Sequence, residues 1–276
     1  MLKRIRRKYF RNKLSITGEA VKNKQVNLEW WNKKKNLGDV LSLVVYKGML
    51  DAKGIKMNQK TKKTVHLFGV GSVIGMGNFD AVIWGSGIHT FNTVKDIVGQ
   101  RKYRKYDIRA VRGPITASLL TACGYNCPKV YGDPAILMTD IYPVKQLEKK
   151  YKTSVILHIE HQNVERPDDV HYINMNTDDY KKVIDEIMMS EKVISSSLHG
   201  IILSETYGVP TVFMLEGMEN ELLKFYDWYY STGRKNVVIA DTIQQAIEMD
   251  GMELPDLTEM KKALKEAFPY DLWNKK

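Results

Sequence analysis

Cysteine is scarce in this 276-residue sequence, and long apolar runs are absent. The two cysteines, Cys123 and Cys127, are too few for a disulfide framework, and no second Cys or His pair accompanies them to complete a metal site. No segment approaches the ~20 consecutive apolar residues that a membrane-spanning helix needs. The N-terminus lacks the apolar stretch and cleavage site of a signal peptide. These absences predict a cytoplasmic protein with reduced thiols and no structural metal.

Positive charge is concentrated at the N-terminus. The formal net charge is +10, and removing seven basic residues of the first 13 leaves +3 on the rest of the chain. Those seven residues, with no acid among them, are Lys3, Arg4, Arg6, Arg7, Lys8, Arg11 and Lys13. Such an arm suits an anionic membrane surface or nucleic acid, since each basic residue near an anionic bilayer contributes about 1 kcal/mol. A solvated start to the first helix explains the same charges.

Apolar strand patterns alternate with helical ones along the chain, and 43% hydrophobic residues are ample for a core. The strand segments, each running into a turn, are 26–31, 65–72, 81–89, 106–114, 129–135, 154–159, 172–175, 192–195, 211–214 and 237–240. Strands that are apolar throughout indicate parallel sheets covered on both faces. We therefore predict two α/β domains with Rossmann-like sheets, 1–145 and 146–276, separated by a cleft. The charged segment 145–152 is interpreted as a linker or a crossing helix, and the last helices as packing back on the first domain.

The segment 193–204 passes from an apolar strand through three serines into an amphipathic helix. Ser196 or Ser197 is a natural N-cap, because its hydroxyl can accept a bond from an otherwise unpaired first-turn amide. His199 then lies in the first helical turn at the carboxyl end of a strand, the edge where open α/β sheets bind ligands. Gly200 leaves backbone room beside the imidazole. A buried histidine packed under a turn is the alternative interpretation.

A second helix entrance follows the first predicted strand. Asn36 can cap the helix that begins there, and Asp39 in its first turn suits the positive end of the helix dipole. Gly38 lies between them. Besides this capping role, the pattern places an amide and a carboxylate at the same sheet edge as His199.

Arg112 and two glycines mark further turns at this edge. Pro114 occupies the first helical position after Gly113, so a guanidinium that matches phosphate or carboxylate geometry stands at a helix entrance. A surface arginine paired with an acid is the alternative. Gly85 and Gly87 form a Gly-x-Gly turn that does not complete Gly-x-Gly-x-x-Gly into a helix. We interpret them as close backbone approaches to a ligand other than NAD.

Lys224 and Asp227 are spaced i, i+3 in a helix predicted over 221–228, so they share one helix face. Lys224 could hold an anionic ligand. A surface ion pair between Lys224 and Asp227 explains the spacing equally well.

Several of these motifs follow one another in a defined order over roughly residues 26–230. The segments are Asn36-Leu37-Gly38-Asp39, Trp84-Gly85-Ser86-Gly87, Val111-Arg112-Gly113-Pro114, Gly132-Asp133-Pro134-Ala135, Ser196-Ser197-Leu198-His199-Gly200 with Tyr207-Gly208-Val209-Pro210, and Lys224-Phe225-Tyr226-Asp227. This ordered set resembles the polysaccharide pyruvyl transferase family. The resemblance implies two Rossmann-like domains arranged as in GT-B glycosyltransferases. It also implies transfer of pyruvate from phosphoenolpyruvate, as donor substrate and without a cofactor, to two hydroxyls of a sugar in a surface polysaccharide or its lipid-linked precursor.

The chemistry of this transfer suggests a role for each motif. His199 is the candidate general acid/base, and Asp39 is a candidate base beside Asn36. The candidate substrate-binding residues are Asn36, Gly38, Gly85, Gly87, Arg109, Arg112, Ser196, Ser197, Leu198 and Lys224. Some family members carry an arginine where this chain has Ser197, so Arg109, Lys224 or Arg234 would supply the missing cation, or the donor lies differently.

Two other functions compete with this hypothesis. A nucleotide-sugar glycosyltransferase could share the same two-domain plan. A non-catalytic protein could bind RNA or an anionic membrane through residues 3–13, but this leaves the polar residues at the sheet edge without a role, and we expect no nucleic-acid partner. With a lipid-linked acceptor, the arm would hold the enzyme at the inner face of the cell membrane.

Overall fold

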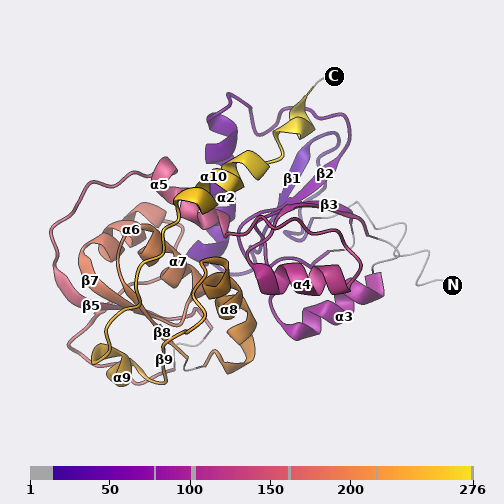
Figure 1. Ribbon diagram of the computed structural model, residues 1–276. Coiled ribbons are helices and arrows are strands. Elements are labelled where there is room, and N and C mark those ends of the chain that lie inside the picture. Colours follow the sequence, from indigo (N-terminus) through magenta and orange to yellow (C-terminus); the bar gives the residue numbers. More distant parts are fainter. Residues whose placement is uncertain (1–14, 78, 101–103, 161–162, 216, 275–276) are drawn as a thin grey trace.

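The structure is a computed structural model that describes residues 15–77, 79–100, 104–160, 163–215 and 217–274. The basic arm at 3–13 lies outside these residues. Two sheets carry the described fold, one of four strands and one of five, and every strand pairs with its neighbours in parallel. The predicted α/β class with parallel sheets is therefore confirmed, and Figure 1 shows the two sheets with their helices on either side of the molecule.

The first sheet is built from the N-terminal half of the chain. Its strands are β1 (Val26–Glu29), β2 (Val65–Phe68), β3 (Ala81–Trp84) and β4 (Tyr106–Ala110), in the order β1-β2-β3-β4. The helices of this half are α2 (Leu37–Asp51), α3 (Phe91–Gln100), α4 (Pro114–Ala122), the 3-10 helix η1 (Pro134–Leu137) and α5 (Met138–Ile141). All residues of β2 and β3 are buried, as their apolar sequences predict. The short strand expected at 129–131 forms a single bridge between Val111 and Tyr131.

The second sheet reverses its direction of winding once. Its strands are β5 (Tyr151–Ile156), β6 (His171–Tyr172), β7 (Ser190–Ser195), β8 (Thr211–Met214) and β9 (Ile239–Ala240), in the order β6-β5-β7-β8-β9. The helices are α6 (Tyr180–Met188), α7 (Leu198–Thr206), η2 (Glu219–Glu221), α8 (Leu222–Ser231) and α9 (Ile243–Ile247). After β6 is added on one side of β5, all later strands are added on the other, so β5 and β7 flank a topological switch point. Ligands of open α/β sheets bind outside the carboxyl ends of the strands at such a point.

The chain ends against the first sheet. Helix α10 (Thr258–Ala267) and η3 (Tyr270–Trp273) follow the second sheet in sequence, yet the indole of Trp84 donates to the carbonyl of Leu264 at 2.8 Å. The hydroxyl of Tyr270 likewise donates to the carbonyl of Met49 in α2 at 2.8 Å, and α10 lies beside α2 in Figure 1. The C-terminal segment thus covers the N-terminal half.

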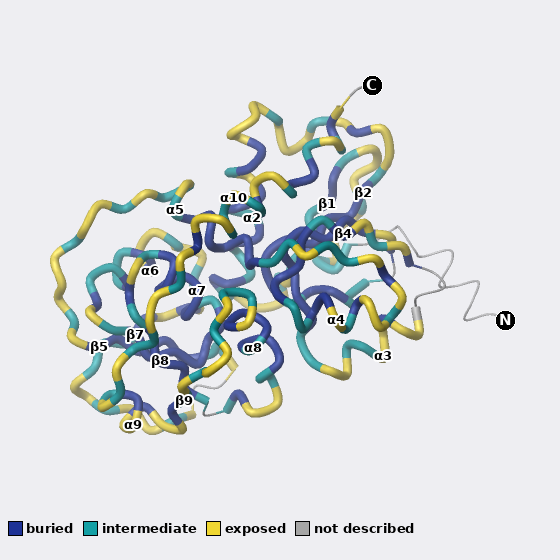
Figure 2. The backbone as a smooth tube through the Cα atoms, in the orientation of Figure 1, coloured by how far each residue is buried: buried dark blue, intermediate teal, exposed yellow. Residues whose placement is uncertain are grey.

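The two halves share one apolar core. The cluster that contains Leu41 of α2 also contains Ile201 of α7, and Figure 2 shows buried backbone running through both sheets and the region where they meet. Residues 145–150 form no helix and lead directly into β5, so the alternative of a crossing helix is wrong. Within the described part of the chain, no helix is long and apolar enough to cross a membrane.

Candidate active site

His199 lies in the first turn of α7, directly beyond the carboxyl end of β7. Ser197 is the N-cap predicted from the sequence: its hydroxyl accepts a hydrogen bond from the amide of Gly200 at 3.4 Å. The neighbouring Ser196 accepts a bond from the amide of His158 at 3.0 Å. His158 follows β5, so this bond joins the carboxyl ends of β5 and β7. His199 therefore occupies the topological switch point of the second sheet.

A buried carboxylate faces the imidazole. Nε2 of His199 lies 3.6 Å from Oδ2 of Asp133, whose side chain is fully buried, whereas that of His199 is 12% exposed. The other oxygen of Asp133 accepts a bond from the amide of Ala135 at 3.0 Å, as the N-cap of η1. Neither Nε2 nor Oδ2 has another hydrogen-bond partner in the structure. The two buried atoms thus face each other just beyond hydrogen-bond distance, as a proton-accepting carboxylate and an imidazole nitrogen.

The start of α2 lies against the other side of the imidazole. Asn36 caps α2 as predicted: its carbonyl accepts from the amide of Gly38 at 3.3 Å, while its amide group donates to Asp39 at 2.7 Å. A Cβ atom placed on Gly38 would overlap Nδ1 of His199, so only glycine leaves room for the ring here. Burial raises the pKa of Asp39, and the charges of His199 and other nearby cations oppose that rise. The prediction that Asp39 and His199 share one sheet edge is therefore wrong, since they follow strands of two different sheets, but the two helix entrances lie side by side and their charges interact.

A third charged group completes the cluster. Lys224 in the first turn of α8 is buried and forms an ion pair with Glu221. Nε2 of His89 lies 3.3 Å from the same carboxylate. Burial lowers the pKa of Lys224, while the carboxylate of Glu221 raises it; the charge of Asp39 acts in the same direction as Glu221. Although burial alone would raise the pKa of Glu221, its hydrogen bond with His89 and the charge of Lys224 hold it below the usual range.

Lys224 does not pair with Asp227, and the alternative of a surface ion pair is wrong. Both side chains are buried, and Asp227 instead contacts Arg112, with Nε 3.2 Å from the carboxylate. The backbone amides of Ile115 and Thr116 donate to the other carboxylate oxygen at 2.9 and 3.0 Å. The anion at the entrance of α4 in this structure is therefore Asp227 from the chain itself.

The remaining nitrogens of Arg112 are also engaged. Nη1 donates to the hydroxyl of Ser72 at 2.5 Å and Nη2 to the carbonyl of Ile88 at 2.8 Å. A Cβ atom on Gly87 would overlap the guanidinium, and one on Gly85 would overlap the ring of Pro134. The close backbone approaches at both glycines are thus to protein groups, and a role of Arg112 in holding the donor stays a prediction.

The other predicted residues lie in different surroundings. Arg109 is partly exposed and bound by two carboxylates, those of Asp107 and Asp271. Arg234 forms an ion pair with the buried Glu205 at 2.6 Å. Leu198 packs its side chain into the core. Of the three cations considered as substitutes for an arginine at Ser197, Lys224 is the one whose charge acts on Asp39.

Sequence reasoning missed Asp133, Glu221 and His89. Asp133 lies in the segment Gly132-Asp133-Pro134-Ala135, whose pattern predicts a strand and turn but no role for the side chain. The available signal was the sequence Asp133-Pro134, because an aspartate before a proline at a helix start is a strong N-cap and holds its carboxylate at a fixed place. Among the residues that the structure describes, no group of three His, Cys, Asp or Glu side chains is arranged to hold a metal ion.

Fold and site together define an α/β protein with an imidazole–carboxylate pair, a second carboxylate and a buried lysine where two parallel sheets meet. The sequence model of the polysaccharide pyruvyl transferases matches residues 9–216, which is well over half of the chain. The protein therefore belongs to the polysaccharide pyruvyl transferase family, and membership implies that it is a transferase.

Three individual proteins are similar to this chain in sequence or in fold. An uncharacterised protein of Acanthamoeba polyphaga mimivirus is 28% identical over 220 residues, which cover 74% of either chain. The succinoglycan biosynthesis protein ExoV of Rhizobium meliloti is 28% identical over 213 residues, 74% of this chain and 64% of ExoV. A functionally uncharacterised protein from Klebsiella pneumoniae has a similar solved structure, with a TM-score of 0.51 and 14% identity over 87% of this chain and 98% of that one. This last likeness concerns the fold alone.

Proposed function

We propose that this protein transfers pyruvate from phosphoenolpyruvate to two hydroxyls of one sugar and thereby forms a cyclic ketal. The acceptor in this proposal is a surface polysaccharide or its lipid-linked precursor, in line with the family and with the succinoglycan biosynthesis named for ExoV. The observation that carries the proposal is the juxtaposition of His199, backed by Asp133, with Asp39 and Lys224.

The reaction requires two proton acceptors and one proton donor. Protonation of the methylene carbon of phosphoenolpyruvate makes the adjacent carbon electrophilic, and the first sugar hydroxyl adds to it and loses its proton. The carbon–oxygen bond to phosphate then breaks, and the second hydroxyl adds and loses its proton to close the ketal. One of the two hydroxyl protons replaces the one given to the methylene carbon, and the other leaves with inorganic phosphate. The products are therefore the ketal and hydrogen phosphate.

The side chains of the cluster suit these steps. His199 is the general acid that protonates the methylene carbon, and Asp133 holds its ring in one orientation. Asp39 accepts a hydroxyl proton, because a carboxylate whose pKa is raised by burial is a stronger base than an exposed one. Lys224 and the first-turn amides of α7, which include that of Leu198, attract the phosphate and carboxylate of the donor.

Thermal stabilisation by phosphoenolpyruvate tests the donor. A ligand at ~100 times its dissociation constant adds ~2.7 kcal/mol to the free energy of unfolding. We expect phosphoenolpyruvate to raise the unfolding temperature of the wild type, and Lys224→Met to remove this shift. The matched control is Lys261→Met, which removes a half-buried lysine of α10 whose pKa is also lowered by burial and which donates to Thr139.

Two outcomes of this experiment change the proposal. A shift with UDP- or GDP-sugars and none with phosphoenolpyruvate would overturn pyruvyl transfer in favour of a glycosyltransferase of the GT-B plan. A phosphoenolpyruvate shift that persists in Arg112→Ala would assign Arg112 to holding the structure and remove it from the donor site.

The basic arm extends the proposal to the membrane. A lipid-linked acceptor would be met at the cytoplasmic leaflet, whose anionic surface attracts clustered basic residues. We expect the full chain, and not a variant that lacks residues 1–13, to float with anionic liposomes. Equal flotation of both proteins would overturn the role of the arm, and turnover on a soluble acceptor should survive the deletion.

A further inference from the structure

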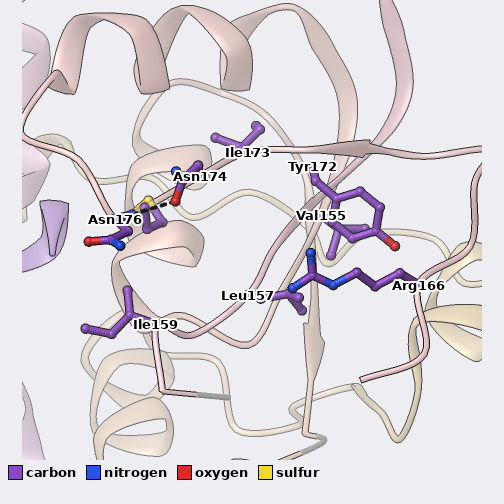
Figure 3. Close-up of a pocket in the computed structure, with 9 residues that line it drawn as sticks. Val155, Leu157, Ile159, Arg166, Tyr172, Ile173, Asn174 and Asn176 are labelled. Carbon is purple, nitrogen blue, oxygen red and sulfur yellow. Dashed lines mark hydrogen bonds between the residues drawn. The ribbon is translucent and has the colours of Figure 1, made fainter. Parts of the chain in front are cut away.

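A cavity of about 370 Å³ opens over the carboxyl ends of β5 and β6, beside the switch point (Figure 3). Parallel neighbours such as these two strands need a crossover connection, and in most α/β folds it contains a helix that covers the sheet. Here the described residues between β5 and β6 form no helix. The apolar side chains of Leu157, Ile173 and Met175 are therefore left as the floor of a cavity and are not covered by a helix.

Polar and aromatic groups surround this apolar floor. The guanidinium of Arg166 lies 5.5 Å from the ring centre of Tyr172, and Figure 3 shows both side chains along one wall of the cavity. Asn174 and Asn176 line the opposite side, where the side chain of Asn174 accepts a bond from the amide of Asn176 at 2.8 Å. An amide can both donate to and accept from hydroxyl groups, and a guanidinium can donate to them, while the aromatic ring and the apolar floor suit the C–H faces of a sugar ring.

The cavity is connected to the candidate active site through the loop that precedes α2. The amide of Leu37 donates to the carbonyl of Met175, a cavity residue, at 2.9 Å. Two exposed ion pairs also join this loop to the second half of the chain: Lys34 pairs with Glu160 at 2.9 Å and Lys35 with Asp178 at 3.6 Å. The same loop carries Asn36, which binds Asp39. The backbone of the cavity residue Met175 is thus bonded to the chain segment that positions the candidate base.

We propose that this cavity binds the sugar unit next to the one that receives pyruvate, so that it selects acceptor glycans of at least two units. The inference rests on the proposed function, because it assigns the second sugar of the acceptor. A single sugar would make only the contacts at the reacting hydroxyls. A second ring held by Arg166, Tyr172 and Asn174 adds affinity and fixes which hydroxyls face Asp39.

Saturation-transfer NMR on the full chain tests this assignment with maltose, lactose and cellobiose as probes, beside UMP. In the wild type we expect saturation transfer to at least one disaccharide. In Arg166→Ala and in Asn174→Ala we expect the affinity for that disaccharide to be about tenfold weaker, because one charge-assisted or several neutral hydrogen bonds are lost. The matched control, Lys182→Ala, removes an exposed cation from α6 of the same half and should bind as the wild type does. Circular dichroism checks that all three variants fold.

Three results would overturn the inference. The first is no saturation transfer to any disaccharide, and the second is equal saturation transfer in all variants. The third is saturation transfer to UMP alone that is lost in Arg166→Ala, which would make the cavity a nucleotide site. The phosphoenolpyruvate shift is measured on the same samples and should be unchanged in every variant. A missing phosphoenolpyruvate shift in the wild type would contradict the proposed function, whereas unchanged disaccharide binding in the variants would contradict only the cavity's role.

Discussion

Asp227 on α8 and Arg112 before α4 form an ion pair in which neither side chain is exposed to solvent. The pair joins the C-terminal half of the chain to the N-terminal half, and the carboxylate also accepts two amides at the start of α4. Gly113 is required for this contact, since a Cβ atom there would overlap the backbone of Asp227. The helix that is fixed in this way, α8, also carries Lys224. The ion pair thus joins the two halves of the chain and also fixes the helix that positions Lys224.

The first prediction concerns stability. Asp227→Asn should lower the free energy of unfolding by about 3–5 kcal/mol, because it leaves the charge of Arg112 buried without a partner. Urea denaturation measures the loss. Arg109→Ala is the control: it breaks two partly exposed ion pairs, each of which should contribute less than about 1 kcal/mol. Equal losses in the two variants would contradict the importance of the buried pair.

Local sequence patterns were sufficient for the parallel α/β pattern and for two helix caps, but not for short helices such as α5 and α9. Asn36 and Ser197 cap the helices they were predicted to cap, because an N-cap depends on residues within three positions of it. The pairings across the chain were not predictable in the same way. Arg112 meets Asp227, 115 positions away, and no short-range spacing reveals which acid will fill a helix entrance. The contact between His199 and Asp133 was not predictable for the same reason, because the two residues are far apart in the sequence.

The second prediction separates the two members of the imidazole–carboxylate pair. His199→Ala should lower kcat about 10²–10⁴-fold, the usual contribution of general acid–base catalysis. Asp133→Asn should reduce kcat by a smaller factor, because the acid remains and only its orientation is relaxed. The KM for phosphoenolpyruvate should change little in Asp133→Asn. Steady-state kinetics of phosphate release measures both, and near-normal kcat in His199→Ala would remove the histidine from the mechanism.

The third prediction uses the contact between Gly38 and the imidazole. Gly38→Ala should lower kcat, because the added methyl group would displace the ring of His199 from its place between α2 and Asp133. Alanine within a helix is favoured over glycine by about 0.5–1 kcal/mol, so the loss should not come from unfolding. Gly99→Ala in α3 makes the same exchange where a Cβ atom meets no neighbour, and it should leave kcat unchanged. Equal kcat in both variants and the wild type would show that the ring is free to move.

The last prediction is a pH dependence that arises from Asp39. Burial raises the pKa of this carboxyl group in the folded protein above 3.8, its ordinary value. The folded state therefore binds more protons than the unfolded chain between pH 3.8 and the folded pKa, and the free energy of unfolding contributed by this group falls as the pH rises through that interval. Asp39→Asn cannot ionise and does not lose this contribution.

Relative to the wild type, the Asp39→Asn variant should therefore gain stability between pH 4 and pH 7, whatever constant difference the substitution itself introduces. Urea denaturation of both proteins at the two pH values measures the gain. The same ionisation should appear in kcat/KM as a loss of activity on the acidic side, and this loss should be absent from the residual activity of Asp39→Asn. A stability difference that shrinks as the pH rises would mean that the nearby cations His199 and Lys224 outweigh burial, and that Asp39 is a weaker base than the proposed mechanism requires.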